Sequence, residues 1–197
     1  MEWIVGIDEV GRGALAGPVV VAAAMMPKGF VLRNCPPGKL KDSKKLSAKQ
    51  REEWAKYFGA NPGVEFAIAR VYPRQIEKRN ISRAANLAAE RAFGRLAVAH
   101  NLKSNTAVFL DGGLFLGNDK GQRSKHGKTI IKGDEKISAI KIASIVAKVH
   151  RDDFMCRLAK SYPAYGFEVH KGYGTKVHRR ALRKHGPSAV HRLTFVS

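Results

Sequence analysis

Cysteine is scarce in this sequence, and long apolar runs are absent from it. The two cysteines, Cys35 and Cys156, lie far apart and show no metal-ligand spacing. This scarcity excludes a disulfide-dense scaffold, and the seven histidines form no His/Cys cluster of the kind that binds zinc. No apolar run approaches the roughly 18 to 20 residues of a membrane span, and no signal peptide precedes the first expected strand. We therefore expect a cytoplasmic protein.

Acidic residues are also few. The 197 residues include 16 Asp and Glu against 36 Lys and Arg, a formal net charge of +20. This excess predicts a polyanionic partner, with nucleic acid first and an acidic membrane surface second. No long basic amphipathic helix stands apart from the expected core, which disfavours the membrane. No internal repeat or linker-like composition shift divides the chain, so we expect one domain with a basic, aromatic C-terminal part.

The opening stretch WIVGIDEVGRGALAGP has the pattern of a strand that delivers carboxylates to its end. Alternation places Trp3, Val5 and Ile7 on one face and Asp8 on the other. A buried carboxylate is costly without a cation beside it, and the adjacent Glu9 adds to that cost because like charges resist ionising together. Neighbours in a strand point to opposite faces, so Glu9 joins Asp8 only if the strand bends there. The pattern predicts half of a divalent-metal site.

Two other interpretations of this stretch remain open at this point. An adjacent Asp-Glu pair is often a solvated turn. The glycines suggest a dinucleotide-binding turn, but their spacing is GxGxxxG rather than GxGxxG. The apolar run VVVAAAMMP follows where that fold needs an amphipathic helix, and it predicts a second strand in a hairpin with the first.

A second carboxylate at a strand end follows later in the chain. The run TAVFL, residues 106–110, is apolar without alternation, which predicts burial on both faces, and it ends in Asp111 and two glycines. Two such features predict a shared site at the ends of adjacent strands. Further strands are expected at residues 64–72 and 129–132, and helices at residues 48–59, capped by Ser47, 76–96 and 138–160.

Several polar residues allow more than one role. Ser43 and Lys44, in the run DSKK, either contact a phosphate or lead into a charged helix. Asn80 either caps a helix or points into a groove. Tyr173 lies between two glycines, which favours an exposed ring that stacks on bases or sugars over a packed one.

Acidic and basic residues alternate in the last long helix. Lys148 and Arg151 are expected on its basic side. Asp152 and Asp153 are expected to pair with Arg151 and Arg157 rather than to bind a metal.

The ordered motifs GIDEVGRGALAGPV, DSKKL, LDGG, KGDEK, ASIVAKVHRD, HKGYGT and HRLTF resemble those of bacterial type 2 ribonucleases H, the ribonuclease HII family. The resemblance runs along most of the chain, and its first motif is highly specific. It implies an α/β protein with a ribonuclease H-like fold, a mixed five-stranded sheet flanked by helices. Residues 1–197 would form one catalytic domain in which residues 161–197 are a C-terminal helical extension that contacts substrate. The sister type 3 enzymes carry an extra N-terminal domain, for which we expect no room because the first motif begins at residue 3.

The resemblance also implies roles for individual residues. The family's four catalytic, metal-binding acids fall on Asp8, Glu9, Asp111 and Asp134. Its substrate contacts fall on the turn that reads the ribose 2′-hydroxyl, on the phosphate-contacting segment and on the aromatic that packs on the sugar at an RNA–DNA junction. These contacts are, in that order, Gly11, Arg12 and Gly13; Ser43 and Lys44; and Tyr173, with Asn80, Lys148 and Lys171 as further candidates.

The implied reaction is endonucleolytic hydrolysis of the RNA strand of RNA–DNA hybrids, and of duplex DNA 5′ to a single embedded ribonucleotide. Two Mg²⁺ or Mn²⁺ ions would serve it, because these ions prefer hard oxygen ligands such as carboxylates and can relieve charge on the leaving oxygen. Selectivity for RNA requires a sensor of the 2′-hydroxyl. The expected products carry 3′-hydroxyl and 5′-phosphate ends, and the family default is a monomer without a small-molecule cofactor. The rival, a non-catalytic basic nucleic-acid-binding protein, gives no reason for two carboxylates at strand ends.

Overall fold

Five strands form one mixed sheet in the computed structural model, which describes residues 2–36, 40–117, 122–124 and 126–196. Their order in the sheet is β3-β2-β1-β4-β5. β1 pairs antiparallel with β2 and parallel with β4; β2 pairs antiparallel with β3, and β4 parallel with β5. The expected mixed five-stranded sheet and opening hairpin are confirmed. The strands are β1 (Trp3–Val10), β2 (Val19–Pro27), β3 (Glu65–Val71), β4 (Ala107–Asp111) and β5 (Lys128–Ile130).

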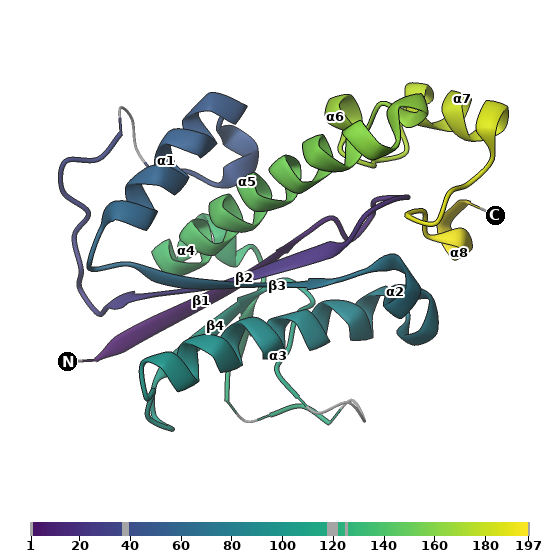
Figure 1. The fold of residues 1–197 in the computed structure, drawn as a ribbon. Coiled ribbons are helices and arrows are strands. Elements are labelled where there is room, and N and C mark those ends of the chain that lie inside the picture. Colours follow the sequence, from purple (N-terminus) through teal and green to yellow (C-terminus); the bar gives the residue numbers. More distant parts are fainter. Residues whose placement is uncertain (1, 37–39, 118–121, 125, 197) are drawn as a thin grey trace.

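Helices cover both faces of this sheet, with α3 on one face and α1 and α5 on the other (Figure 1). Ser47 caps α1 through its hydroxyl, which accepts from the Gln50 amide. The α-helices are α1 (Ala48–Ala60), α2 (Pro73–Arg79), α3 (Ile81–Ala99), α4 (Gly133–Lys136), α5 (Ser138–Ser161), α6 (Phe167–His170), α7 (Lys176–His185) and α8 (Leu193–Val196); two short 3-10 segments are η1 (Ser43–Lys45) and η2 (Pro163–Tyr165).

The alternation in β1 divides its side chains between two cores. Val5 and Ile7 are buried in the cluster beneath α3, whereas Ile4 packs in the cluster shared with α1 and α5. Both faces of the central strands are therefore sealed from water, and the polar residues of β1 gather at its carboxyl end.

The C-terminal segment lies beside the loop that joins β1 to β2 (Figure 1). Ala16 in that loop makes an isolated antiparallel bridge with His191. Tyr165 and Phe167 stack in a third cluster together with Met155 of α5. The residues after α5 thus pack against the loop that follows the first carboxylates.

Two local expectations are wrong, and the bend considered for β1 is absent from its pairing. The predicted helix over residues 76–96 is two helices, α2 and α3, because Asn80 has a positive φ of 64° and breaks the helical path. Its side chain then caps α3 by accepting from the Arg83 amide, which confirms the capping alternative. β4 is not buried on both faces, since Phe109 is only half-buried. β1 does not bend at Asp8 and Glu9, and its pairing with β2 runs on to Val10.

Candidate active site

Asp8 and Glu9 leave the end of β1 on opposite faces of the sheet. Asp8 is buried on the α5 side, where Ser144 donates a hydrogen bond to it. Glu9 lies on the α3 side, where its Oε1 accepts from Arg12 Nη1 at 3.2 Å while Arg12 Nη2 reaches the hydroxyl of Ser82 at 2.8 Å. The two carboxylates therefore lie near the carboxyl end of β1 but on its two different faces, since β1 continues without a break to Val10.

Asp111 lies alongside Asp8 because β1 and β4 are adjacent and parallel. The paired residues Ile7 and Leu110 immediately precede the two aspartates. Asp111 Oδ1 accepts from the Gly133 amide at 2.6 Å, which brings the start of α4 to the same edge. The predicted meeting of two strand-end carboxylates is thus what the sheet produces.

Asp134 approaches from α4 and is buried. Its Oδ2 accepts from Lys44 Nζ at 3.2 Å. Lys132, before α4, has a positive φ of 54°, and the chain turns sharply there into the four-residue helix. The fourth acidic position is therefore delivered by a turn and not by a strand.

The carboxylates raise one another's pKa. Burial raises the pKa of Asp8 well above its ordinary value, and the charges of Glu9 and Asp111 raise it further. Burial raises the pKa of Glu9 as well, although Arg12 opposes that shift. The pKa of Asp111 is raised by burial and then by the charge of Asp134. Such a set binds protons or cations more tightly than isolated carboxylates do.

The donor set suits a hard divalent cation, because it consists of carboxylate oxygens that repel one another around an open cavity. Within the described ranges, no three acidic, histidine or cysteine side chains already stand in the arrangement of a metal site. Two of the carboxylates instead contact protein cations, Glu9 with Arg12 and Asp134 with Lys44. A divalent ion would compete with these two contacts.

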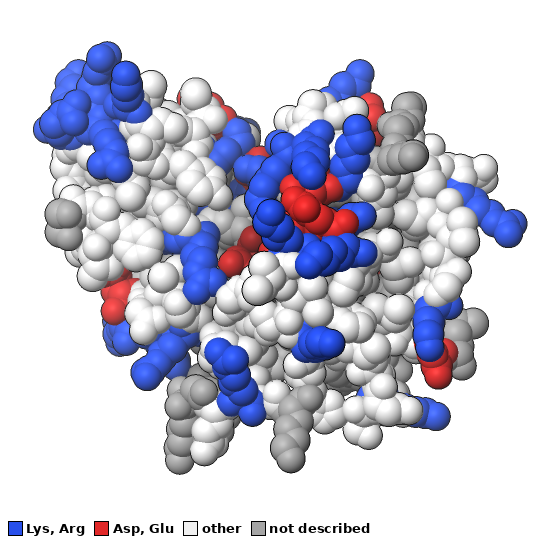
Figure 2. Space-filling model, turned by 180° about the vertical axis from the view of Figure 1, so that it is seen from behind, with Lys and Arg blue, Asp and Glu red and all other residues white. Residues whose placement is uncertain are grey.

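One cavity of about 440 Å³ collects most of the predicted substrate contacts. Basic residues surround its acidic edge, and on the face shown in Figure 2 acidic side chains are recessed between lysine and arginine side chains. Figure 2 also shows a notch beside this region, and on the other side of the notch a dense basic patch at the position of α7 in Figure 1. The residues lining the cavity are Asp8, Glu9, Val10, Gly11, Arg12, Gly13, Ser43, Lys44, Arg51, Asp111, Ser144, Lys148 and Tyr173.

Asn80 and Lys171 are not among the residues lining this cavity. The Asn80 side chain is engaged in capping α3. Lys171 lines an adjoining cavity of about 780 Å³ between α1 and α5, which shares Lys148 and Arg51 with the first. The structure therefore brings eleven of the thirteen predicted site residues to the acidic edge or its cavity, counting Asp134 through its contacts with Lys44 and Asp111.

Sequence reasoning missed Ser144, Arg51 and the true setting of Arg151. Ser144 is one helical turn before Lys148, so the spacing of α5 could have placed both on one face. Arg51 donates to the carbonyls of Ser43 and Leu46 and so fixes the loop that carries Lys44; its sequence context gives no signal of this. Arg151 is fully buried, and Asp152 pairs with Lys148 instead. The predicted pair of Asp153 with Arg157 is confirmed.

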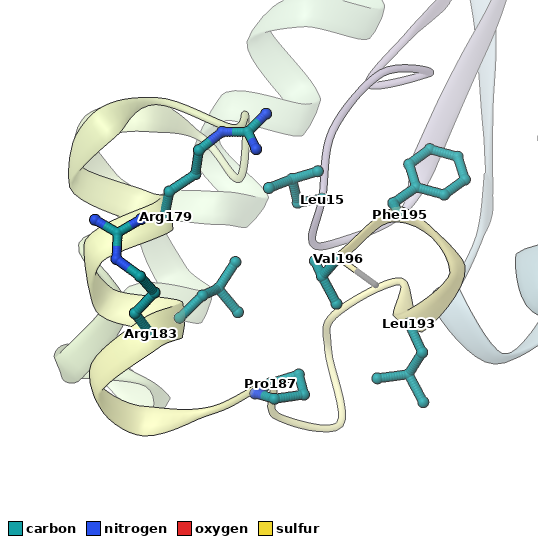
Figure 3. Close-up of a pocket in the computed structure, with 8 residues that line it drawn as sticks. Leu15, Arg179, Arg183, Pro187, Leu193, Phe195 and Val196 are labelled. Carbon is teal, nitrogen blue, oxygen red and sulfur yellow. The ribbon is translucent and has the colours of Figure 1, made fainter.

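A second cavity of about 440 Å³ lies at the C-terminal end of the molecule (Figure 3). Leu15, Phe195 and Val196 face it from one side, and Arg179 and Arg183 of α7 from the other. The lining residues that the structure describes include no acidic side chain, so this cavity lacks the donors that a hard cation needs.

Known proteins share both the sequence and the fold. The family model for ribonuclease HII matches residues 5–197. Ribonuclease HII of Chlamydia pneumoniae is 43% identical over 192 residues, which cover 98% of this chain and 82% of that protein. Ribonuclease HII of Treponema denticola is 42% identical over 197 residues, 96% of each chain.

Two solved structures share the fold. Ribonuclease H2 from Pyrococcus horikoshii has a TM-score of 0.69 at 22% identity and covers 98% of this chain and 95% of its own. A ribonuclease HIII, Bst-RNase HIII, solved in complex with Mn²⁺, has a TM-score of 0.68 at 20% identity and covers 99% of this chain and 65% of its own.

The sheet order and the flanking helices define a ribonuclease H-like α/β fold. The family model and the curated relatives place the chain among the nuclease hydrolases. The chain belongs to the ribonuclease HII family. Members of this family are ribonuclease H endonucleases, so the non-catalytic alternative is wrong. Among the described residues, no helix is long and apolar enough to cross a membrane.

Proposed function

We propose that this protein hydrolyses the RNA strand of RNA–DNA hybrids and cuts duplex DNA 5′ to single embedded ribonucleotides, leaving 3′-hydroxyl and 5′-phosphate ends. One observation carries the proposal. Asp8 and Asp111 lie at the carboxyl ends of adjacent parallel strands, and in a chain of net charge +20 the charges of Glu9 and Asp111 add to the effect of burial in raising the pKa of Asp8. Carboxylates that repel one another destabilise the folded protein unless a cation binds among them, so such a cluster points to a functional site that binds a cation.

Asp8, Glu9, Asp111 and Asp134 would hold two Mg²⁺ or Mn²⁺ ions. When bound, these ions supply an activated water and relieve charge on the leaving oxygen. The protein's own part is to orient the carboxylates. Asp111 Oδ1 is fixed by the Gly133 amide, and Asp8 Oδ1 by the Glu9 amide at 2.7 Å. Among the described contacts, Asp111 keeps its other oxygen for a ligand, whereas Asp8 also receives the Ser144 hydroxyl.

The basic side chains around the cavity would bind the nucleic-acid backbone. Lys44 and Lys148 line it, and both are held by carboxylates, Lys44 by Asp134 and Lys148 by Asp152. Phosphates would replace or share these carboxylate contacts. Ser43 lies deeper, with its hydroxyl 2.8 Å from that of Ser144, and so supports the loop from below.

The turn Gly11–Arg12–Gly13 would read the 2′-hydroxyl, and Tyr173 would pack on the neighbouring sugar. Space is open around Gly13, where a Cβ would meet no atom within 4 Å, so a ligand can approach its backbone closely. Tyr173 lines the same cavity and is half-buried. A backbone that a sugar can approach, beside an aromatic ring that lines the same cavity, suits a ribonucleotide that is followed by DNA.

The rest of the molecule supports a soluble nucleic-acid enzyme of one domain. Residues 161–197 would contact the duplex through the basic helix α7, whose sequence is KVHRRALRKH. We propose that the protein works as a cytoplasmic monomer without a small-molecule cofactor. The related structure of ribonuclease HII from Archaeoglobus fulgidus is a complex with PCNA, so a replication clamp is a reasonable partner to test here.

The decisive experiment uses a labelled DNA duplex with one ribonucleotide, in Mg²⁺, Mn²⁺ or EDTA. We expect metal-dependent cutting immediately 5′ to the ribonucleotide, and no cutting in EDTA. The Asp8→Asn protein should bind the duplex but not cut it. Asp153→Asn is the matched control, because Asp153 is exposed and pairs only with Arg157 among the described contacts.

Each other outcome overturns a stated part of the proposal. Cutting only within longer RNA stretches would contradict the reading of single ribonucleotides. Cutting in EDTA would contradict the role of divalent ions. Undiminished turnover by Asp8→Asn would remove that residue from the reaction.

A further inference from the structure

Arg151 is a fully buried arginine whose side chain makes no ion pair among the described contacts. Its guanidinium donates to three backbone carbonyls instead. Nε reaches Pro18 at 3.0 Å, Nη2 reaches Ala16 at 3.2 Å, and Nη1 reaches Lys171 at 2.8 Å. The first two carbonyls belong to the loop after β1 and the third to the segment before Tyr173. One side chain therefore joins two segments that lie far apart in the sequence.

The same guanidinium contacts both groups proposed to read the ribonucleotide. A Cβ on Gly11, at the start of the sugar-reading turn, would lie 2.1 Å from Arg151 Nε, so the turn rests directly on the arginine. Arg151 Cζ is also 5.2 Å from the centroid of the Tyr173 ring, over which it lies. One guanidinium is therefore in reach of both the turn and the ring.

The chemistry of this position is specific for arginine. A planar guanidinium presents its donors in a fixed fork, whereas a lysine ammonium is a single point at the end of a flexible chain and cannot hold three carbonyls in these directions. A planar cation also stacks on an aromatic ring. Burial lowers the pKa of Arg151, which records the cost of keeping a charge here. An apolar side chain would fill this space without that cost but would leave the carbonyls unpaired.

We propose that Arg151 is a positioning residue that sets the separation between the Gly11–Gly13 turn and the Tyr173 ring, and thereby determines the preference for a ribonucleotide followed by DNA. This inference rests on the function proposed above. A single embedded ribonucleotide fits only when turn and ring are correctly spaced. A continuous RNA strand offers a 2′-hydroxyl at every position, so it tolerates a change in that spacing.

The test compares kcat/KM on a duplex with one ribonucleotide and on a continuous RNA–DNA hybrid. Arg151→Lys should lower the ratio of the two values by about tenfold or more, since loss of one charge-assisted hydrogen bond is worth about that factor. Most of the loss should fall in kcat on the single-ribonucleotide duplex. The matched control is Arg157→Lys on the same helix, where the side chain is exposed and pairs with Asp153; it should leave the ratio unchanged.

A double-mutant cycle separates positioning from general structural support. In a Tyr173→Ala background, Arg151→Lys should no longer change the ratio, because the ring whose place it sets is gone. Equal loss on both substrates, or the same effect with and without Tyr173, would overturn the inference. Arg151→Gln serves as a second variant, and failure of both variants to fold would assign Arg151 a purely structural role. The proposed function fails in a different way, namely if the wild-type protein does not cut either duplex.

Discussion

Two neighbouring groups of charged residues differ in how their charges are satisfied. One is the acidic edge, formed by Asp8, Glu9, Asp111 and Asp134, and the other is the pair of buried arginines. The carboxylates at the acidic edge raise one another's pKa and face an open cavity. Arg151 and Arg192 are fully buried, and their donors meet backbone carbonyls. Arg192 reaches the carbonyls of Gly17 and Arg12, with its Nη1 at 2.8 Å from the latter.

This difference separates groups kept for a ligand from groups kept for the fold. The donors of the two arginines already have hydrogen-bond partners, so the cost of burying them is mainly the desolvation of their charge. Burial accordingly lowers the pKa of Arg192 to about 9. The carboxylates have fewer partners than oxygens, and repulsion among them destabilises the folded state until a cation arrives. Substitutions in the two regions should therefore change stability in opposite directions.

Asp8→Asn gives the largest expected effect. Because burial and like charges raise the pKa of Asp8 in the folded state, its ionised form destabilises the fold at neutral pH. The neutral amide should raise the free energy of unfolding by about 1 kcal/mol, while cleavage falls by about a thousandfold or more. Urea unfolding and single-turnover cleavage measure the two effects. A variant that lost both stability and activity would contradict the comparison.

Arg192→Met should lower the free energy of unfolding, whereas Asp8→Asn should raise it. The methionine fills the space but leaves the carbonyls of Gly17 and Arg12 unpaired, so the free energy of unfolding should fall by about 2 to 4 kcal/mol. Urea unfolding measures it, with the exposed Arg183→Met as the matched control. If the buried and exposed substitutions cost the same, the carbonyl contacts contribute nothing to the fold.

Gly11 and Gly13 belong to one turn, but replacing them by alanine should change stability by different amounts. Gly11 has a positive φ of 86° and contacts Arg151, so Gly11→Ala should cost about 2 to 3 kcal/mol of stability. Gly13→Ala meets open space and should cost less than about 0.5 kcal/mol, yet slow cutting at a single ribonucleotide by obstructing the sugar. Thermal unfolding together with the cleavage assay resolves them, and an equal loss of stability in both variants would refute the contrast.

His191 shows how stability near the C-terminus depends on pH. Burial, and then the charge of the neighbouring His178, lower its pKa to about 4. The unfolded chain therefore takes up a proton first, and stability present above about pH 6.5 is lost toward pH 4, by roughly 3 kcal/mol.

His191→Gln should flatten this dependence, measured as urea midpoints between pH 7 and pH 4.5. The exposed His185→Gln is the control and should follow the wild-type curve. An unchanged slope in His191→Gln would show that other groups govern acid stability.

The sequence predicted the acidic edge because its cause is local. An apolar run that ends in a carboxylate and glycine recurs at Asp8 and Asp111, and two parallel neighbours in a sheet bring such ends together. The helix break at Asn80 escaped prediction because apolar periodicity continues through it, and only the left-handed backbone of Asn80 interrupts it. The partner of Asp152 was wrong because residues one apart on a helix do not face each other, whereas Lys148 lies one turn back.

The buried arginines escaped prediction for a different reason. A basic residue in a basic chain is expected on the surface. The sequence around Arg151 and Arg192 does not indicate that either side chain will contact backbone carbonyls. Apart from the Lys171 carbonyl, those carbonyls belong to the loop after β1, which lies 133 to 180 residues away along the chain. Long-range satisfaction of backbone groups is set by the assembled fold and leaves no periodic pattern in the sequence.

Arg192 has a consequence for the order of events during synthesis. β1 and β4 leave the ribosome well before residue 192 does, so the carboxylates can be brought together while the Arg12 carbonyl still lacks its partner. Arrival of the C-terminal segment then fixes the turn from behind. A nascent chain is therefore expected to bring Asp8 and Asp111 together early and to fix the backbone of the Gly11–Gly13 turn last.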